Sequence, residues 1–69
     1  MNRKAYYAGQ RAASEHYLLT GMLLDMNAEQ ETAQQERDRC HFDHEIWYWN
    51  GQIDWIMQFQ ATKQVRRTL

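Results

Sequence analysis

A chain of 69 residues is at most one domain, close to the size at which a single hydrophobic core contributes only a few kcal/mol. Its one cysteine excludes an intramolecular disulfide and favours a reducing, cytoplasmic setting. The net charge of −1 gives no general attraction to nucleic acid or anionic lipid, and no apolar run approaches the roughly 20 residues that span a bilayer.

The first predicted element is a helix over residues 3–26. Small and apolar residues recur there every three or four positions, which is the period of one helix face. The first half of this face is small and the second half is bulky, so another helix can come close to the first half. The residues predicted to pack on this face are Ala5, Ala8, Ala12, Leu19 and Met22.

Residues 27–35 carry no large apolar side chain and are predicted to contain a polar turn. Asn27 followed by Gln30 resembles a helix-capping pair, but a segment that is polar all round is either solvent-exposed or not a stable helix. A turn near residues 31–32 makes the flanking helices antiparallel. That register brings together Leu19 with His44, Ala12 with Gly51, and Ala8 with Trp55.

The second predicted helix covers residues 35–66. Five apolar residues follow one another at steps of four, three, four and three, as on one helix face. Asn50-Gly51 usually marks a turn, and a break there would give a third helix, but the apolar spacing stays in phase through the pair and favours continuity. The residues predicted to pack on this face include Phe42, Ile46, Ile53 and Ile56.

The aromatic residues of this helix cover more than the roughly 100° stripe that an ordinary amphipathic helix needs. The helix therefore requires several neighbours or a partner from outside the chain. One interpretation is a homodimer core with no other role, and the other is that some rings anchor a protein partner. The predicted interface residues are Trp47, Tyr48, Trp49, Trp55 and Phe59.

Metal-ligating residue types gather only around residue 40. On a continuous helix Glu36, Cys40 and His44 stack at four-residue steps, with His41 alongside. The alternative is a polar shoulder beside the aromatic residues, and whether these side chains bind metal stays open. The sequence shows no pocket for a nucleophile and no glycine-rich phosphate loop, so we expect neither an enzyme nor a cofactor.

A second class of function is nucleic-acid or ribosome association. In the antiparallel hairpin both chain ends, and with them two basic clusters, come together at one end of the molecule. The candidate contacts are Arg3, Lys4, Arg11, Lys63, Arg66 and Arg67.

Two resemblances concern short stretches. Tyr7-Ala8-Gly9, with Trp49 and Gly51, resembles elements of the ribosome modulation factor family, which implies a small helical protein that binds ribosomes. The opening MNRKAYYAGQRAA and the Trp-, Gln- and Met-rich remainder look like small accessory proteins of lambda-like bacteriophages. That resemblance implies a cytoplasmic helical protein that binds a host or phage protein.

The sequence therefore predicts a single all-α domain over residues 1–69, an antiparallel two-helix hairpin that self-associates into a helical bundle. The predicted function is a non-enzymatic regulatory module that binds a protein partner through the aromatic face of the second helix.

Overall fold

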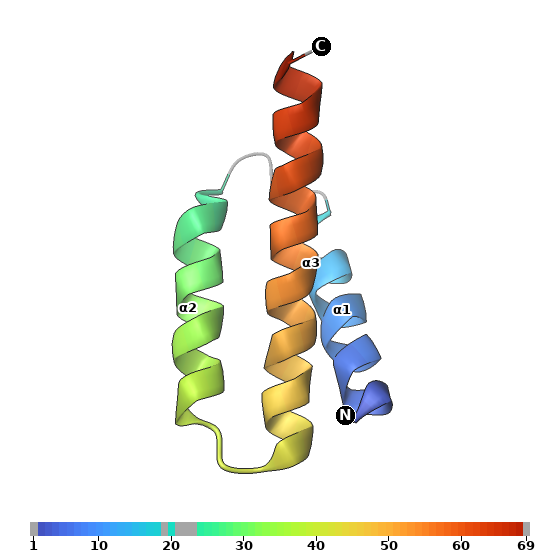
Figure 1. The fold of residues 1–69 in the computed structure, drawn as a ribbon, viewed down its shortest axis with the longest axis vertical. Helices are drawn as coiled ribbons and strands as arrows, with labels where there is room; N and C mark the ends of the chain where they lie inside the picture. The colour runs from blue at the N-terminus through green and yellow to red at the C-terminus, as the bar shows by residue number, and fades with distance from the viewer. Residues whose placement is uncertain (1, 19, 21–23, 69) are drawn as a thin grey trace.

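The computed structural model describes residues 2–18, 20 and 24–68, with side chains described as far as residue 61. It contains three helices: α1 (Arg3–Tyr17), α2 (Met26–Arg39) and α3 (Asp43–Thr68). The described residues form no strand, which confirms the all-α class. Helices α1 and α2 flank α3, and each packs against it (Figure 1).

Helix α1 runs parallel to α3. The Tyr6 ring lies 6.4 Å from the Trp47 ring, and eleven residues further along α1 the Tyr17 ring lies 6.2 Å from the Trp55 ring. The predicted antiparallel register between the first helix and the aromatic helix is therefore wrong. Gly51 does not face Ala12, Ala8 does not face Trp55, and the partner predicted for His44, Leu19, lies outside the described residues.

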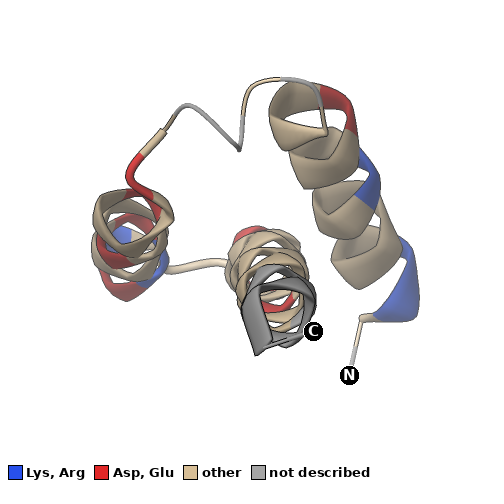
Figure 2. Ribbon diagram, turned by 90° about the horizontal axis from the view of Figure 1, so that it is seen from above, with Lys and Arg blue, Asp and Glu red and all other residues tan. Residues whose placement is uncertain are grey.

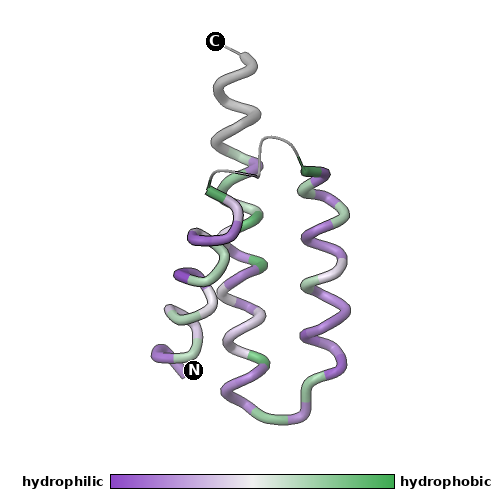
Figure 3. Tube along the Cα trace, turned by 180° about the vertical axis from the view of Figure 1, so that it is seen from behind, coloured by the Kyte–Doolittle hydropathy of each residue, from purple (hydrophilic) through white to green (hydrophobic). Residues whose placement is uncertain are grey.

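Helix α2 occupies the segment in which a turn was predicted, so the turn within residues 27–35 is also wrong. Asp25 caps this helix, because its Oδ1 accepts hydrogen bonds from the backbone N–H groups of Asn27 and Ala28 at 3.1 and 3.3 Å. Helix α2 is hydrophilic over most of its length (Figure 3). It buries only Met26 and Ala33, so its apolar stripe is too narrow to be recognised in the sequence.

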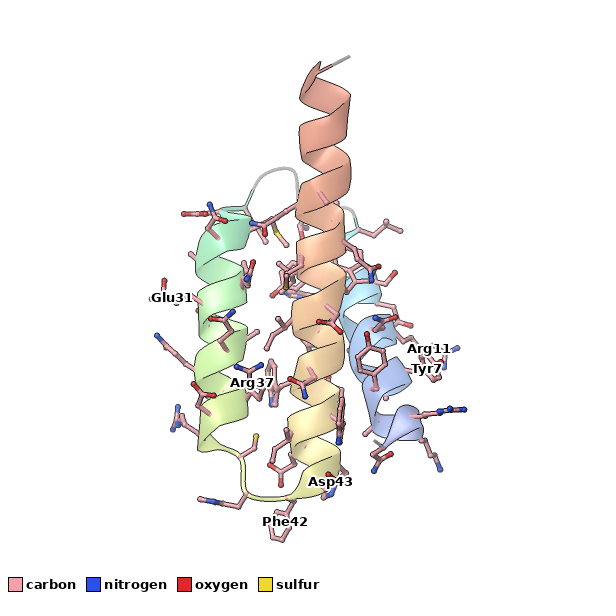
Figure 4. The ribbon with its side chains drawn as sticks, viewed as in Figure 1. Tyr7, Arg11, Glu31, Arg37, Phe42 and Asp43 are labelled. Carbon is pink, nitrogen blue, oxygen red and sulfur yellow. The ribbon has the colours of Figure 1, made fainter. Side chains whose placement is uncertain are left out.

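Polar side chains fix α2 antiparallel to α3. Gln60 Nε2 donates to Asn27 Oδ1 at 2.7 Å near one end, and Arg37 donates from a guanidinium nitrogen to Asn50 Oδ1 at 3.2 Å near the other. Figure 4 shows Arg37 directed toward α3, whereas Glu31 points away from the bundle. These two hydrogen bonds hold α2 in its orientation on α3, as apolar contacts do between other pairs of helices.

The first predicted helix was too long and the second began too early. Helix α1 ends at Tyr17, so the face predicted to continue to residue 26 is interrupted, and Leu19 and Met22 lie outside the described residues. Cys40 adopts an extended conformation after α2, and the Phe42 carbonyl accepts from the N–H groups of Glu45 and Ile46 as α3 begins.

Helix α3 continues through Asn50-Gly51, as the spacing favoured. Both Gly9 and Gly51 are buried at the crossing of α1 and α3, where a Cβ atom on either residue would overlap a backbone carbonyl of the other helix. The two backbones therefore approach closely because both crossing positions lack a side chain.

The core of the described region is small. Ile53 and Ile56, both predicted to pack, are buried, whereas Phe42 was also predicted to pack and is 63% exposed at the end of the bundle (Figure 4). Ile46 is half-buried. The buried apolar residues are Ala13, Tyr17, Met26, Ala33, Ile53 and Ile56.

Because α1 and α3 are parallel, the beginning of α1 and the end of α3 lie at opposite ends of a molecule 41 Å long (Figure 1). The two basic clusters therefore do not come together. Arg3 and Lys4 lie in the first turn of α1, whereas Lys63, Arg66 and Arg67 lie in the last turns of α3, where side chains are not described.

Candidate functional site

A groove runs along α3 on the side where α1 and α2 stand apart. Its first part has a volume of about 380 Å³ and draws residues from all three helices. Its second part, of about 260 Å³, lies toward the beginning of α1 and α3. Tyr48 and Trp49 line both parts, so we treat them as one aromatic groove. Its lining residues are Ala5, Ala8, Ala12, His16, Tyr17, Glu29, Thr32, Ala33, His44, Glu45, Tyr48, Trp49 and Gln52.

The α1 wall of the groove consists largely of small side chains. The small residues of α1 divide into two sets: Gly9 and Ala13 are buried, whereas Ala5, Ala8 and Ala12 line the groove. A row of methyl groups leaves room for the backbone of another helix. Ala5, Ala8 and Ala12 were predicted to pack against the aromatic helix; they line the groove together with Tyr48 and Trp49, with Ala5 and Ala12 half-buried and Ala8 exposed.

The floor of the groove is aromatic. The rings of Tyr48 and Trp49 meet edge to face, with centroids 5.6 Å apart and planes at 86°. Both side chains are half-buried, so each has surface still accessible to a partner.

The remaining predicted interface rings lie elsewhere on α3. The Trp47 ring meets the Tyr6 ring of α1. The Trp55 ring stacks against the rings of Tyr17 and Phe59, with centroid distances of 6.2 and 5.3 Å. All three of these α3 rings are half-buried. The five predicted rings thus form three groups, and only Tyr48 and Trp49 line the groove.

Tyr17 and Glu29 join the two walls at one end of the groove. The Tyr17 hydroxyl donates to Glu29 Oε2 at 3.0 Å, which connects α1 to α2. Burial of Tyr17, reinforced by this hydrogen bond and by the Glu29 charge, raises the pKa of the phenol to about 12. Neither residue was predicted as part of a site, because α2 was taken for a turn.

We expect the free energy of unfolding of Tyr17→Phe to change less with pH in the alkaline range than that of wild type. A tyrosine in the unfolded chain ionises near pH 10, so the contribution of neutral Tyr17 is complete below that pH and is lost as the pH rises through about 12. Between about pH 9 and pH 12 the wild type should lose on the order of 1–2 kcal/mol more than Tyr17→Phe in urea unfolding. Parallel pH profiles for the two proteins would contradict this assignment.

A second polar contact fixes α1 on α3. Tyr6 donates its hydroxyl proton to Asp54 Oδ2 at 2.6 Å and accepts from Gln10 Nε2 at 3.0 Å. The hydrogen bond to Asp54, followed by burial, raises the pKa of the Tyr6 phenol. This contact holds the α1 wall in place from the side opposite the groove.

Around residue 40, the potential metal ligands do not form the helical row that the sequence suggested. Cys40 lies between two helices, so the helical row of Glu36, Cys40 and His44 considered for a metal does not form, and no group of three potential ligands gathers elsewhere among the described residues. The Cys40 thiol donates to the Glu36 carbonyl at 3.1 Å, and desolvation, followed by Glu45, raises its pKa.

Comparison with protein-family models, curated proteins and solved structures finds no match for this chain. The resemblances to the ribosome modulation factor family and to bacteriophage accessory proteins therefore stay predictions. Within the described residues, no helix combines the length and apolarity needed to cross a membrane.

Proposed function

We propose that this chain is a small non-enzymatic interaction module that binds a helical surface of a protein partner in the aromatic groove. The observation that carries the proposal is the half-exposed pair Tyr48 and Trp49 on the floor of an open groove between two helices. Aromatic side chains that remain accessible are enriched at the centres of protein interfaces, where they contribute most of the binding energy.

The shape and chemistry of the groove support a helix as the bound element. Two helices on either side of a third leave an elongated depression, and the methyl groups of the α1 wall allow a close backbone approach. Thr32 and Gln52 offer hydrogen-bonding groups near the aromatic floor. A partner helix with apolar residues facing α3 and polar residues facing α2 would match these walls.

The charge of the groove argues against nucleic acid as its ligand. Glu29 lines its first part and Glu45 its second, so phosphate groups would meet carboxylates in both. The basic clusters that suggested nucleic-acid binding lie at opposite ends of the bundle.

Photo-crosslinking from inside and outside the groove tests this proposal. Thr32 lines the groove, whereas its neighbour Glu31 points away from the bundle (Figure 4), and both side chains are exposed. A photoreactive phenylalanine analogue placed at residue 32, in cells that express the full chain, should form a covalent adduct with a protein. The same analogue at residue 31 should not. Adducts at neither position, or equal adducts at both, would refute the groove as a binding site.

A further inference from the structure

The charged residues that line the aromatic groove are both acidic. Glu29 of α2 lines its first part and Glu45 of α3 lines its second, and among the described residues no lysine or arginine lines either part. The basic segments of α1 lie on the outer side of that helix, away from α3 (Figure 2). The two histidines of the lining have no permanent charge. A ligand in the groove therefore meets two negative charges and no fixed positive charge.

Neither groove carboxylate is neutralised by a cation within the described part of the chain. The ion pairs formed there involve Glu15, Glu36 and Asp38 instead. Glu29 accepts a hydrogen bond from the Tyr17 hydroxyl, which is a neutral donor. Both groove glutamates are half-buried, so a partner that covers them removes much of their remaining contact with water. This removal costs free energy unless the partner brings a positive charge to each carboxylate.

The spacing of the two carboxylates along the groove suits a single bound helix. Gln60 of α3 contacts Asn27, and α2 is antiparallel to α3, so Glu29 lies level with about residue 58 of α3. At a rise of about 1.5 Å per residue, that level is about 20 Å along α3 from Glu45. On a bound helix about 14 residues span the same distance, after which a side chain returns to nearly the same face. One helix in the groove therefore reaches both carboxylates from one face.

We propose that the aromatic groove binds a basic amphipathic helix of another protein. This inference rests on the proposed function, because it names the chemistry of the partner of the same groove. Apolar residues of the bound helix pack on Tyr48 and Trp49, and a lysine or arginine near each end meets Glu29 or Glu45. The methylene groups of such side chains lie along the aromatic rings while the charged groups reach the carboxylates. An acidic helix would be repelled at both ends, and a purely apolar helix would leave both carboxylates covered and unpaired.

Removal of the two groove charges tests this inference, with a matched control. The full chain carries the photoreactive phenylalanine analogue at residue 32. Glu29→Gln together with Glu45→Gln, the groove pair, keeps the size of both side chains and their capacity to accept hydrogen bonds. Glu15→Gln together with Glu31→Gln, the control pair, removes the same charge from exposed residues that do not line the groove. The groove pair should lower the yield of the protein adduct in cells by on the order of tenfold, whereas the control pair should leave it unchanged.

Two further measurements keep both carboxylates, so they apply even where the groove pair loses helical circular dichroism. Raising the salt concentration of a cell extract from about 0.05 M to about 0.5 M should reduce the adduct at residue 32 severalfold. The partner segment attached to residue 32, sequenced by mass spectrometry, should be rich in lysine or arginine.

The outcomes separate this inference from the proposed function. Equal adduct yields in the groove pair and the control pair, or a yield that does not fall with salt, would overturn the basic helix alone. An adduct with an acidic segment or with a second copy of this chain would do the same. The absence of any adduct at residue 32 would overturn the proposed function as well.

Discussion

Replacing Gly9 by alanine is expected to lower the free energy of unfolding by about 2–3 kcal/mol. A Cβ at this position would overlap the Tyr48 carbonyl oxygen and lie 2.8 Å from the Tyr48 carbonyl carbon and 3.2 Å from the Gln52 backbone nitrogen. These are backbone atoms of α3, which cannot move aside as a flexible side chain can. Alanine favours a helix over glycine by about 1 kcal/mol, so the expected loss is what remains after this gain.

The substitution Ala8→Gly separates packing from helix propensity. It exchanges the same two residue types one position earlier, at an exposed site of the same helix, and should cost about 1 kcal/mol. Urea unfolding followed by circular dichroism measures both variants. A Gly9→Ala protein that is more stable than wild type would show that α1 and α3 do not cross at this residue.

Ile56→Ala is expected to lower the free energy of unfolding by about 3 kcal/mol, a large fraction of the stability of a chain of this size. Ile56 has no exposed surface and is the largest completely buried side chain of the described region. Its removal loses apolar burial and leaves a cavity that the surrounding helices cannot fill without moving.

The neighbouring residue provides the control for this second substitution. Met57 is 51% exposed, so Met57→Ala should change the free energy of unfolding by less than about 1 kcal/mol. Thermal unfolding of the two variants beside wild type makes the comparison. Similar losses of stability for Ile56→Ala and Met57→Ala would mean that α3 is rotated about its axis from the orientation described, because the two side chains would then be equally buried.

The sequence predicted the core face of α3 because large apolar residues mark it directly. The spacing that placed Ile53 and Ile56 on one face also favoured a continuous helix through Gly51, and both features are present. Gly51 is a close-contact position, but it meets Tyr6 and Gln10 rather than Ala12, the partner that the predicted register gave it. Spacing identifies which residues share a face, but it does not give the direction of the helix that covers that face.

Helix α2 could not be recognised by the same reasoning, and the groove was missed with it. Its buried contacts are Met26 and Ala33, and its orientation comes from side-chain hydrogen bonds such as that between Arg37 and Asn50. Neither signal is periodic. Asp25 followed by Glu29 in the first turn was an available sign of a helix beginning, since both residue types favour that position.

The separation of the predicted aromatic face into three groups also depends on α1. Because α1 crosses α3 at Gly9 and Gly51, Tyr6 reaches Trp47 on one side, while Tyr17 reaches Trp55 further along. Tyr48 and Trp49 are left between the two walls. Which rings stay accessible is thus decided by the position of two glycines and not by the rings themselves.

Crosslinking from the two faces of α2 tests the central claim most directly, because Thr32 lines the aromatic groove whereas Glu31 points away from the bundle (Figure 4). The account predicts that a photoreactive phenylalanine analogue at residue 32 forms an adduct with a protein and that the same analogue at residue 31 does not. Equal adducts from the two residues, or adducts from neither, would contradict it.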